Sequence, residues 1–481
     1  MSDARRGRVR LALLVSGVVL LIFATVTVLR GGGPGPLPLP RTGRAAPSGD
    51  PFAYRGSRQA AFEARATSGE AQVLFTKSPG GVLATAARVA ALRPLIDAAT
   101  SGSSVDPATL EALVFVESAG RPDAIAGSDP STAAGLTQIL AETGQSLLGM
   151  HIDLARSRRL THAIATASAQ GQAAAVTRLE RQRAKIDDRF DARRALAATV
   201  RYLELARGRF GRADLAVVSY HMGIGNLSNV LAAYDGGQAV PYAQLYFDTA
   251  PDRDSAAFRI LSRFGDDSSL YYWRVLGATN VMRLYRSDRG ALSRLARLEI
   301  AHDSAEEVLH PPDRTASFAD PGSLHSAYSS RAVLPLPSNP AQLGLSYGTS
   351  LGSSAPALGQ ASALYRGLRP AALDLLIELA ARVRALSGGA APLAVAGAVQ
   401  DHAYQRQPGA SDPEGYDGYS LSTTGYAVDI GRSYASRAQA QAFQAMLDRL
   451  QALNLIAWVR EAGVIHITVA SDASRVIAGG V

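Results

Sequence analysis

One carboxylate stands out because it interrupts the apolar stripe of a predicted helix. Glu117 shares a helical face with Leu110, Leu113 and Val114. Burying an ionised carboxylate is costly unless it is paired, and poor solvation raises the pKa of a carboxyl group. A glutamate placed in this way can donate a proton near neutral pH, which indicates an acid/base catalyst. The alternative is a structural glutamate bonded to a nearby arginine or to a helix N-terminus.

The helix that carries this glutamate has clear boundary signals. Asp106 is a typical N-cap, Pro107 suits the first helical position, and Gly120 suits the stop. The pattern therefore predicts a helix from 107 to about 118 whose last turn holds Glu117.

Three short motifs follow one another along the chain: ES at 117–118, GLTQI at 135–139 and SYHMGIG at 219–225. Together they resemble the SLT-type lytic transglycosylases, lysozyme-like enzymes that cut peptidoglycan. The stretches DARRAL at 191–196 and YYWRVL at 271–276 are similar to further helices of that family. The resemblance covers about residues 82–286 and implies an all-α fold for them.

The resemblance implies that Glu117 is the only acid/base. It would protonate the glycosidic oxygen between N-acetylmuramic acid and N-acetylglucosamine, then take the proton of the muramic C6 hydroxyl as that oxygen closes onto C1. The product would be a 1,6-anhydromuramoyl end. Tyr220 would orient the carboxylate; its alternative role is that of a core tyrosine. The implied substrate contacts are Ser118, Gly135, Gln138, His221 and Tyr271.

The chain departs from the family pattern in three places. His221 stands where the family usually has Asn, and Thr137 where it often has Met. An imidazole is bulkier and can titrate, so the role of His221 is open. The stretch 150–185 is a mostly helical insertion, either a solvated hairpin or a lid or partner surface.

Other reactions need a different set of groups. Retaining and inverting glycosidases usually need a second carboxylate, whereas Asp123 and Asp129 are expected to be turn residues. A single glutamate therefore favours the internal transglycosylase reaction. The alternatives are a non-catalytic peptidoglycan-binding scaffold and a hydrolytic, lysozyme-type muramidase.

A second resemblance lies near the C-terminus. The stretches GAVQ at 397–400, SLSTTGYAVD at 420–429 and VIHI at 464–467 are similar to zinc D-Ala-D-Ala carboxypeptidases. Ser422 replaces the first ligand histidine of that family, and Gln400 replaces its arginine. Asp429 and His466 leave two ligands, but catalytic zinc normally has three from the protein. We therefore expect a degenerate domain without metal or cofactor, which binds wall stem peptides or positions the glycan-cutting domain.

The first residues predict a membrane anchor. Arginines at 5, 6, 8 and 10 precede the uncharged, mostly apolar stretch 11–29, which is long enough to span a bilayer and lacks a good cleavage site. The arginines should stay in the cytoplasm, so the rest of the chain should be extracytoplasmic. The expected location is the bacterial cell membrane, crossed once.

The remaining chain divides by composition. Residues 1–10 form the tail, 30–51 a Gly/Pro-rich linker, 52–303 an all-α domain, 304–362 a Pro/Ser/Gly-rich linker and 363–475 an α+β domain. That last domain should contain helices at 370–387 and 436–453 and strands at 393–398, 426–430 and 464–469. The 481 residues include no cysteine, which excludes disulfides and thiolate chemistry. The net charge of +8 comes with scattered arginines and only 6% aromatics, so no nucleic-acid module is expected.

Overall fold

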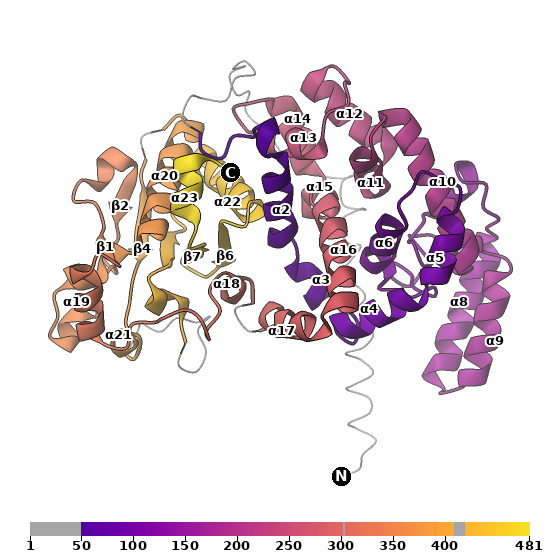
Figure 1. Ribbon diagram of the computed structural model, residues 1–481, viewed down its shortest axis with the longest axis horizontal. Coiled ribbons are helices and arrows are strands. Elements are labelled where there is room, and N and C mark those ends of the chain that lie inside the picture. Colours follow the sequence, from indigo (N-terminus) through magenta and orange to yellow (C-terminus); the bar gives the residue numbers. More distant parts are fainter. Residues whose placement is uncertain (1–49, 302–303, 390, 408–418) are drawn as a thin grey trace, which may run out of the picture. The chain divides into compact units, whose positions relative to one another are not determined.

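The computed structural model describes residues 50–301, 304–389, 391–407 and 419–481 (Figure 1). The predicted tail 1–10, the predicted anchor 11–29 and almost all of the linker 30–51 lie outside the described residues. Within the described part of the chain, none of the helices combines the length and the apolar character needed to cross a membrane. The chain forms two compact units, each assembled from separate segments.

The first unit comprises Ser78–Leu227 and Arg274–Arg289 and is helical, as predicted. Its helices are α4 (Val82–Ala91), α5 (Arg93–Thr100), α6 (Pro107–Ser118), α7 (Ala141–Ser146), α8 (Leu154–Ala169), α9 (Ala173–Ala184), α10 (Ala192–Phe210), α11 (Ala213–Met222) and most of α16 (Tyr271–Ser287). Helix α6 packs against α4, α5 and α10. It is therefore covered on several sides, and this burial supports its length.

Local signals determine both ends of α6. The Asp106 side chain accepts a hydrogen bond from the backbone N–H of Ala108 at 3.0 Å, and Pro107 is the first helical residue, as predicted. The helix ends because Ala119 and Gly120 both have positive φ angles, 54° and 76°. The Ala119 carbonyl then accepts a bond from the Arg88 guanidinium of α4 at 3.0 Å. These contacts hold the last turn of α6 in one place.

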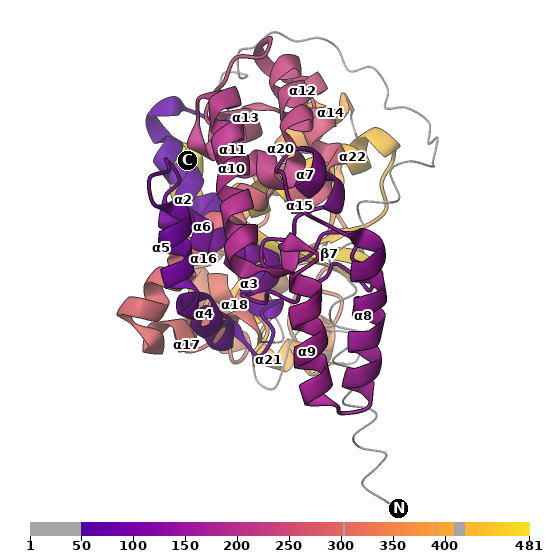
Figure 2. The same ribbon diagram turned by 90° about the vertical axis from the view of Figure 1, so that its right-hand side faces the viewer.

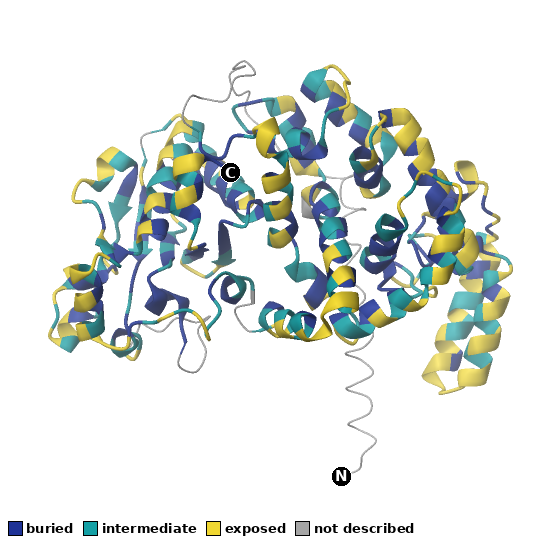
Figure 3. Cartoon of the chain, viewed as in Figure 1, coloured by how far each residue is buried: buried dark blue, intermediate teal, exposed yellow. Residues whose placement is uncertain are grey.

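The predicted insertion forms a helical hairpin. Helices α8 and α9 pack side by side in both views (Figures 1 and 2). Most of their surface is exposed (Figure 3), so the hairpin contributes little core of its own. Its attachment to the unit depends on the residues at its base.

A buried ion pair lies at that base. The Asp187 carboxylate and the Arg189 guanidinium form two hydrogen bonds, of 2.9 and 2.7 Å, and both side chains are 0% exposed. The guanidinium also donates to the carbonyls of Thr132 and Ile139, at 3.1 and 3.4 Å. The Ser157 hydroxyl of α8 donates to Asp187 at 2.7 Å.

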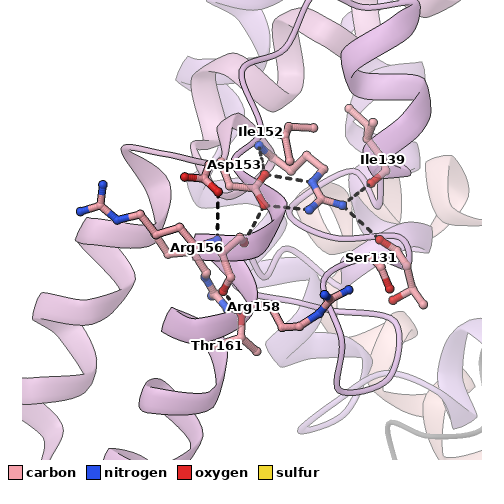
Figure 4. Close-up of polar contacts among 12 residues, drawn as sticks. Ser131, Ile139, Ile152, Asp153, Arg156, Arg158 and Thr161 are labelled. Atoms are coloured by element: carbon pink, nitrogen blue, oxygen red, sulfur yellow. Dashed lines mark hydrogen bonds and ion pairs between the residues drawn. The ribbon is translucent and has the colours of Figure 1, made fainter.

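This cluster joins two parts of the first unit. Figure 4 shows it with Ser131 and Ile139 on the side of the motif loop and Asp153 and Thr161 on the side of the hairpin. The pair thus links α8 to the loop that carries the second sequence motif.

The second unit comprises residues 50–77, Ser228–Trp273 and Gly290–Val481. Its longer helices are α2 (Gln59–Gly69), most of α12 (Ile224–Asp235), α13 (Tyr242–Asp248), α14 (Ser255–Arg263), α17 (Arg289–Glu299), α19 (Pro321–Ser329), α20 (Pro370–Ser387), α22 (Arg437–Ala452) and α23 (Ala473–Gly479). Shorter helices are α3 (Gln72–Thr76), α15 (Gly265–Ser269), α18 (Ser304–Leu309) and α21 (His402–Gln405). The helices predicted at 370–387 and 436–453 are confirmed as α20 and α22.

A five-stranded sheet with the order β2-β4-β5-β7-β6 makes this unit α+β, as predicted. The strands are β2 (Leu345–Tyr347), β4 (Leu393–Gly397), β5 (Ala427–Gly431), β6 (Ile456–Arg460) and β7 (Val464–Val469). Strand β2 pairs in parallel with β4, and the other neighbours are antiparallel. The two edge strands, β2 and β6, are the ones that the sequence pattern missed.

The predicted linker 304–362 is folded where the structure describes it. It contains α18, α19, β2 and the short strand β1 (Leu334–Pro335), which pairs with β3 (Gly367–Leu368). Its few apolar side chains form a core cluster with residues distant in the chain: Phe318, Leu324, Ala327, Val333, Ala355, Leu364, Tyr365, Val399 and Tyr404. Composition alone suggested a linker because the residues that complete this core, as far along the chain as Tyr404, lie outside the segment.

Removing the cation of the buried pair should destabilise the first unit. In Arg189→Met the Asp187 carboxylate stays buried without its partner, a change that costs about 3–5 kcal/mol. The matched control is Arg158→Gln, which breaks the partly exposed 3.0 Å pair with Asp129 and should cost under about 1 kcal/mol. Thermal unfolding of the full chain measures both. Equal shifts in the two variants would contradict the role given to the pair.

A buried histidine makes the stability of the second unit depend on pH. Burial lowers the pKa of His310 to about 4, and Arg369 adds to this shift. Its Nε2 bonds the Val469 carbonyl at 2.6 Å, and its ring stacks on Tyr426 with centroids 4.0 Å apart. The folded unit therefore holds His310 neutral, with Nε2–H as the donor.

Acidification should cost stability through this histidine. The unfolded chain takes up the proton near pH 6.5 and the folded chain only near 4, so the stability contributed by neutral His310 falls as the pH drops below 6.5, by about 2 kcal/mol at pH 5. His310→Gln should be less sensitive to acid than the wild type. His162→Gln, at an exposed hairpin position, should behave as the wild type. Burial raises the pKa of Glu299 to about 7, and this opposite effect is common to all three proteins. Parallel pH profiles for the wild type and His310→Gln would refute the assignment.

Candidate active site

Glu117 lies in the last turn of α6, on the face that the sequence predicted. Leu110, Leu113 and Val114 are fully buried, and Glu117 itself is partly buried. The carboxylate therefore emerges from a rigid, buried helix at the point where that helix meets solvent. Such a position suits a group that must be both oriented and reachable.

Tyr220, on α11, lies within electrostatic reach of this carboxylate. Burial raises the pKa of Tyr220 well above its ordinary value, and the negative charge of Glu117 raises it further. The hydroxyl donates to the Thr137 carbonyl at 2.7 Å, and its oxygen is 3.3 Å from the Thr199 hydroxyl. The tyrosine stays protonated and connects the second motif loop to the neighbourhood of Glu117. Its ring also packs edge-on against Tyr202, with centroids 5.2 Å apart.

The second motif forms a tight loop that is closed by its own hydrogen bonds. The Gln138 amide donates to the carbonyls of Gly135 and Ala124, at 2.9 and 3.2 Å, and its backbone has a positive φ of 51°. Thr137 is fully buried, and its hydroxyl has no hydrogen-bond partner among the described residues. The Gln138 amide nitrogen thus shapes the loop, and contact of the side chain with glycan stays a prediction.

Gly135 is required by a close backbone approach. Its φ is +81°, and a Cβ added there would lie 1.8 Å from the carbonyl oxygen of Arg189. Contact of Gly135 with substrate, which the family resemblance implies, stays a prediction. The neighbour in the structure is the backbone that follows the buried ion pair.

Ser118 caps the end of α6, and its predicted contact with substrate stays a prediction. The side chain is 3% exposed, donates to the Val114 carbonyl at 3.3 Å and accepts from the Arg121 N–H at 3.2 Å. These bonds direct the chain away from the helix immediately after Glu117.

The two remaining predicted contacts differ in exposure. His221 is exposed at the end of α11, whereas Tyr271 is 2% exposed at the start of α16. The His221 side chain therefore lies at the surface, next to Tyr220 in the sequence, and the Tyr271 ring belongs to the packed interior. Substrate contact by either residue stays a prediction.

The two loop acids are turn residues, as predicted. Asp129 accepts from the Ser131 N–H at 2.8 Å and pairs with Arg158 of α8. The N–H of Ser131 contributes most to the lowered pKa of Asp129. Asp123 is exposed and acts electrostatically on Glu180 and Arg183 of α9. Both acids thus interact with the hairpin.

The comparison with protein families bears on the same part of the chain. Residues 94–169 match the family model of the transglycosylase SLT domain. The matched SLT segment includes Glu117, Ser118, Gly135 and Gln138 and ends with α8, before Tyr220. It supports the lysozyme-like part of the resemblance and a function on peptidoglycan of the lytic transglycosylase type. A search of curated proteins found no match.

These comparisons do not support the carboxypeptidase resemblance, but the predicted residues do meet. His466 Nδ1 lies 2.7 Å from Asp429 Oδ1, and its Nε2 lies 3.6 Å from Glu306. His466 and Asp429 line a polar pocket of ≈ 220 Å³ together with Ser422, Gln400 and Glu461. This donor set does not fit a catalytic zinc, because the third position offers a hydroxyl. Among the described residues there is no group of three possible metal ligands.

Sequence patterns missed a second buried acid on α6. Glu111 is 1% exposed and pairs with Arg286 of α16 and, at 3.7 Å, with Arg93 of α5. It has the structural role that was the alternative for Glu117, a buried glutamate bonded to arginine. Its position between Leu110 and the apolar run ALVFV at 112–116 was the available signal. The partner Arg286 is too distant in sequence to be recognised.

A methyl group at Gly135 should disrupt the candidate site. Gly135→Ala would both strain a positive φ and drive a Cβ into the Arg189 carbonyl, so we expect a loss of several kcal/mol or failure to fold. Gly127→Ala is the matched control, because its φ is +91° but nothing lies within 4 Å of the added atom. Thermal unfolding and soluble yield compare the two. Similar losses would mean that backbone strain alone, and not contact with Arg189, requires the glycine.

Proposed function

We propose that this protein is a membrane-anchored lytic transglycosylase that cleaves the β-1,4 bond between N-acetylmuramic acid and N-acetylglucosamine. The observation that carries the proposal is the position of Glu117. It ends a buried helix within the matched SLT segment and acts electrostatically on Tyr220. One oriented, reachable carboxylate is what this reaction needs.

The proposed chemistry uses that carboxyl group twice. Protonated Glu117 first gives its proton to the glycosidic oxygen while the bond from that oxygen to C1 of muramic acid breaks. The C6 hydroxyl oxygen then bonds to C1, and its proton returns to Glu117. The 1,6-anhydromuramoyl end forms without consumption of water.

Tyr220 and the motif loop keep the carboxylate in position. Tyr220 remains neutral because burial and Glu117 both raise its pKa, and its bond to the Thr137 carbonyl holds the ring against the loop. Hydrolysis would use a second acid, but Asp129 pairs with Arg158 and Asp123 interacts with the hairpin. These interactions favour the internal reaction. The hydrolytic muramidase and the idle scaffold are the competing functions.

The location and the C-terminal domain complete the proposal. The arginine cluster before 11–29 supports a single-pass anchor in the bacterial cell membrane, with the working units extracytoplasmic. The polar pocket around Asp429 and Gln400 supports binding of wall stem peptides by a domain without peptidase activity. No cofactor takes part.

Replacing Glu117 by Gln should abolish cleavage and leave the fold intact. General acid/base catalysis contributes about 10²–10⁴-fold, so release of anhydro ends from purified sacculi should fall by at least about 100-fold. Glu204→Gln, at an exposed position on α10, is the control and should cut as the wild type does. Mass spectrometry of the products decides between the functions: reducing ends would indicate a muramidase, and no release by the wild type would indicate a scaffold.

A further inference from the structure

The α8–α9 hairpin carries an unusual concentration of positive charge. Residues 150–185 include seven Arg and Lys but only two Asp and Glu, whereas the whole chain has 49 and 41. Charge of one sign on a surface element raises the local potential and favours a partner of opposite sign. The catalytic proposal leaves this feature unexplained.

The cations of α9 form a stripe on its exposed face, which we call the α9 basic stripe: Arg178, Arg181 and Lys185. They line a shallow hollow of ≈ 510 Å³ together with Ala174, Thr177 and Gln182. All three cations are exposed. Like charges three and four positions apart repel along a helix, so the stripe costs helix stability unless an anion neutralises it.

The acid of α9 does not neutralise the stripe. Glu180 is half-buried and interacts with Asp123 and Arg183, on the side of the hairpin that meets the motif loop. Arg183 is 3% exposed, and its guanidinium lies 3.7 Å from the centre of the Phe190 ring. Helix α9 therefore separates its charges: Arg183 and Glu180 face inward, and the stripe faces solvent.

The hairpin is fixed to the loop of the second motif. Arg158 of α8 pairs with Asp129 at 3.0 Å, and Ser157 of α8 bonds Asp187, whose partner Arg189 holds the Thr132 and Ile139 carbonyls. A polymer bound near Glu117 that extends past this loop would meet the hairpin. The stripe and the candidate site therefore belong to the same compact unit.

We propose that the α9 basic stripe binds the free carboxylates of the stem peptides on the glycan strand that the active site cuts. This inference rests on the proposed function, because the bound polymer is the peptidoglycan that the proposed reaction cuts. Arg178 and Lys185 are separated by about 10 Å of helix rise, so several carboxylates of an extended polymer can be engaged at once. Guanidinium and ammonium groups pair with carboxylates through charge-assisted hydrogen bonds.

Two other anionic partners fit less well. Insertion into a lipid surface needs large apolar side chains beside the cations, but the stripe is flanked by Ala174, Thr177 and Gln182. Single-stranded nucleic acid is held by stacking on aromatic rings, and residues 150–185 contain no Phe, Tyr or Trp. The charge is therefore matched to a hydrophilic polymer.

The test is cosedimentation of the full-length Glu117→Gln protein with purified sacculi at increasing salt. In this background, Arg178→Gln/Arg181→Gln/Lys185→Gln should bind about tenfold more weakly and with a shallower salt dependence. Arg209→Gln/Arg294→Gln/Arg297→Gln is the matched control, since it removes three exposed cations elsewhere and should bind normally. Sacculi whose carboxylates have been converted to neutral amides should bind the Glu117→Gln protein as weakly as untreated sacculi bind the stripe variant.

Several results would overturn the proposal. The first is that the two triple variants lose sacculus binding equally, or that neither loses it. The second is that binding is lost when phosphodiester polymers are stripped from the sacculi and not when the carboxylates are amidated. The third is that anionic phospholipid vesicles capture the protein in a way that depends on the stripe. Activity of the stripe variant with its Glu117 intact on peptide-free glycan strands separates the two proposals. It should equal that of the wild type. If neither protein releases anhydro ends, the proposed function fails, and the amidation result still decides whether the stripe binds carboxylates.

Discussion

The buried Asp187–Arg189 ion pair is the interaction on which the candidate site depends. Both side chains are fully buried, so each charge needs the other and its additional hydrogen bonds. The Arg189 guanidinium holds the carbonyl of Thr132, three residues before the second motif, and that of Ile139, the last residue of the motif, and the Arg189 carbonyl lies against Gly135. Breaking it would release the hairpin and the loop together.

From this pair a series of direct contacts leads to the carboxylate. The loop presents the Thr137 carbonyl to the Tyr220 hydroxyl, and Tyr220 lies within electrostatic reach of Glu117. On the other side, α6 is fixed by its Asp106 cap and by Arg88 at its C-terminal end. The proposed reaction, in which one carboxyl group serves two oxygen atoms in turn, would benefit from this fixed geometry. The outer face of the hairpin carries the exposed cations of the α9 basic stripe.

Sequence patterns predicted the elements whose signals are local. The cap residues gave the ends of α6, and helical or alternating periodicity gave α20, α22, β4, β5 and β7 within one or two residues. The folded segment 304–362 was missed because its apolar residues are few and pack against distant partners. The sequence also did not show that the Gln138 amide bonds Gly135 and Ala124, because this contact exists only once the loop is closed.

The amino-acid sequence by itself determined the chemistry that is available: one glutamate on an apolar helical face, an ordered set of motifs, no thiol, and a C-terminal site whose ligand histidine is replaced by Ser422. These properties depend on residue type and short spacing. Only the tertiary structure decided which acids are structural and which are reachable. Glu111 and Glu117 lie on the same helix, yet Arg286 neutralises the first, and the second emerges beside Tyr220. The reason is physical, because burial and charge pairing depend on residues that only folding brings together.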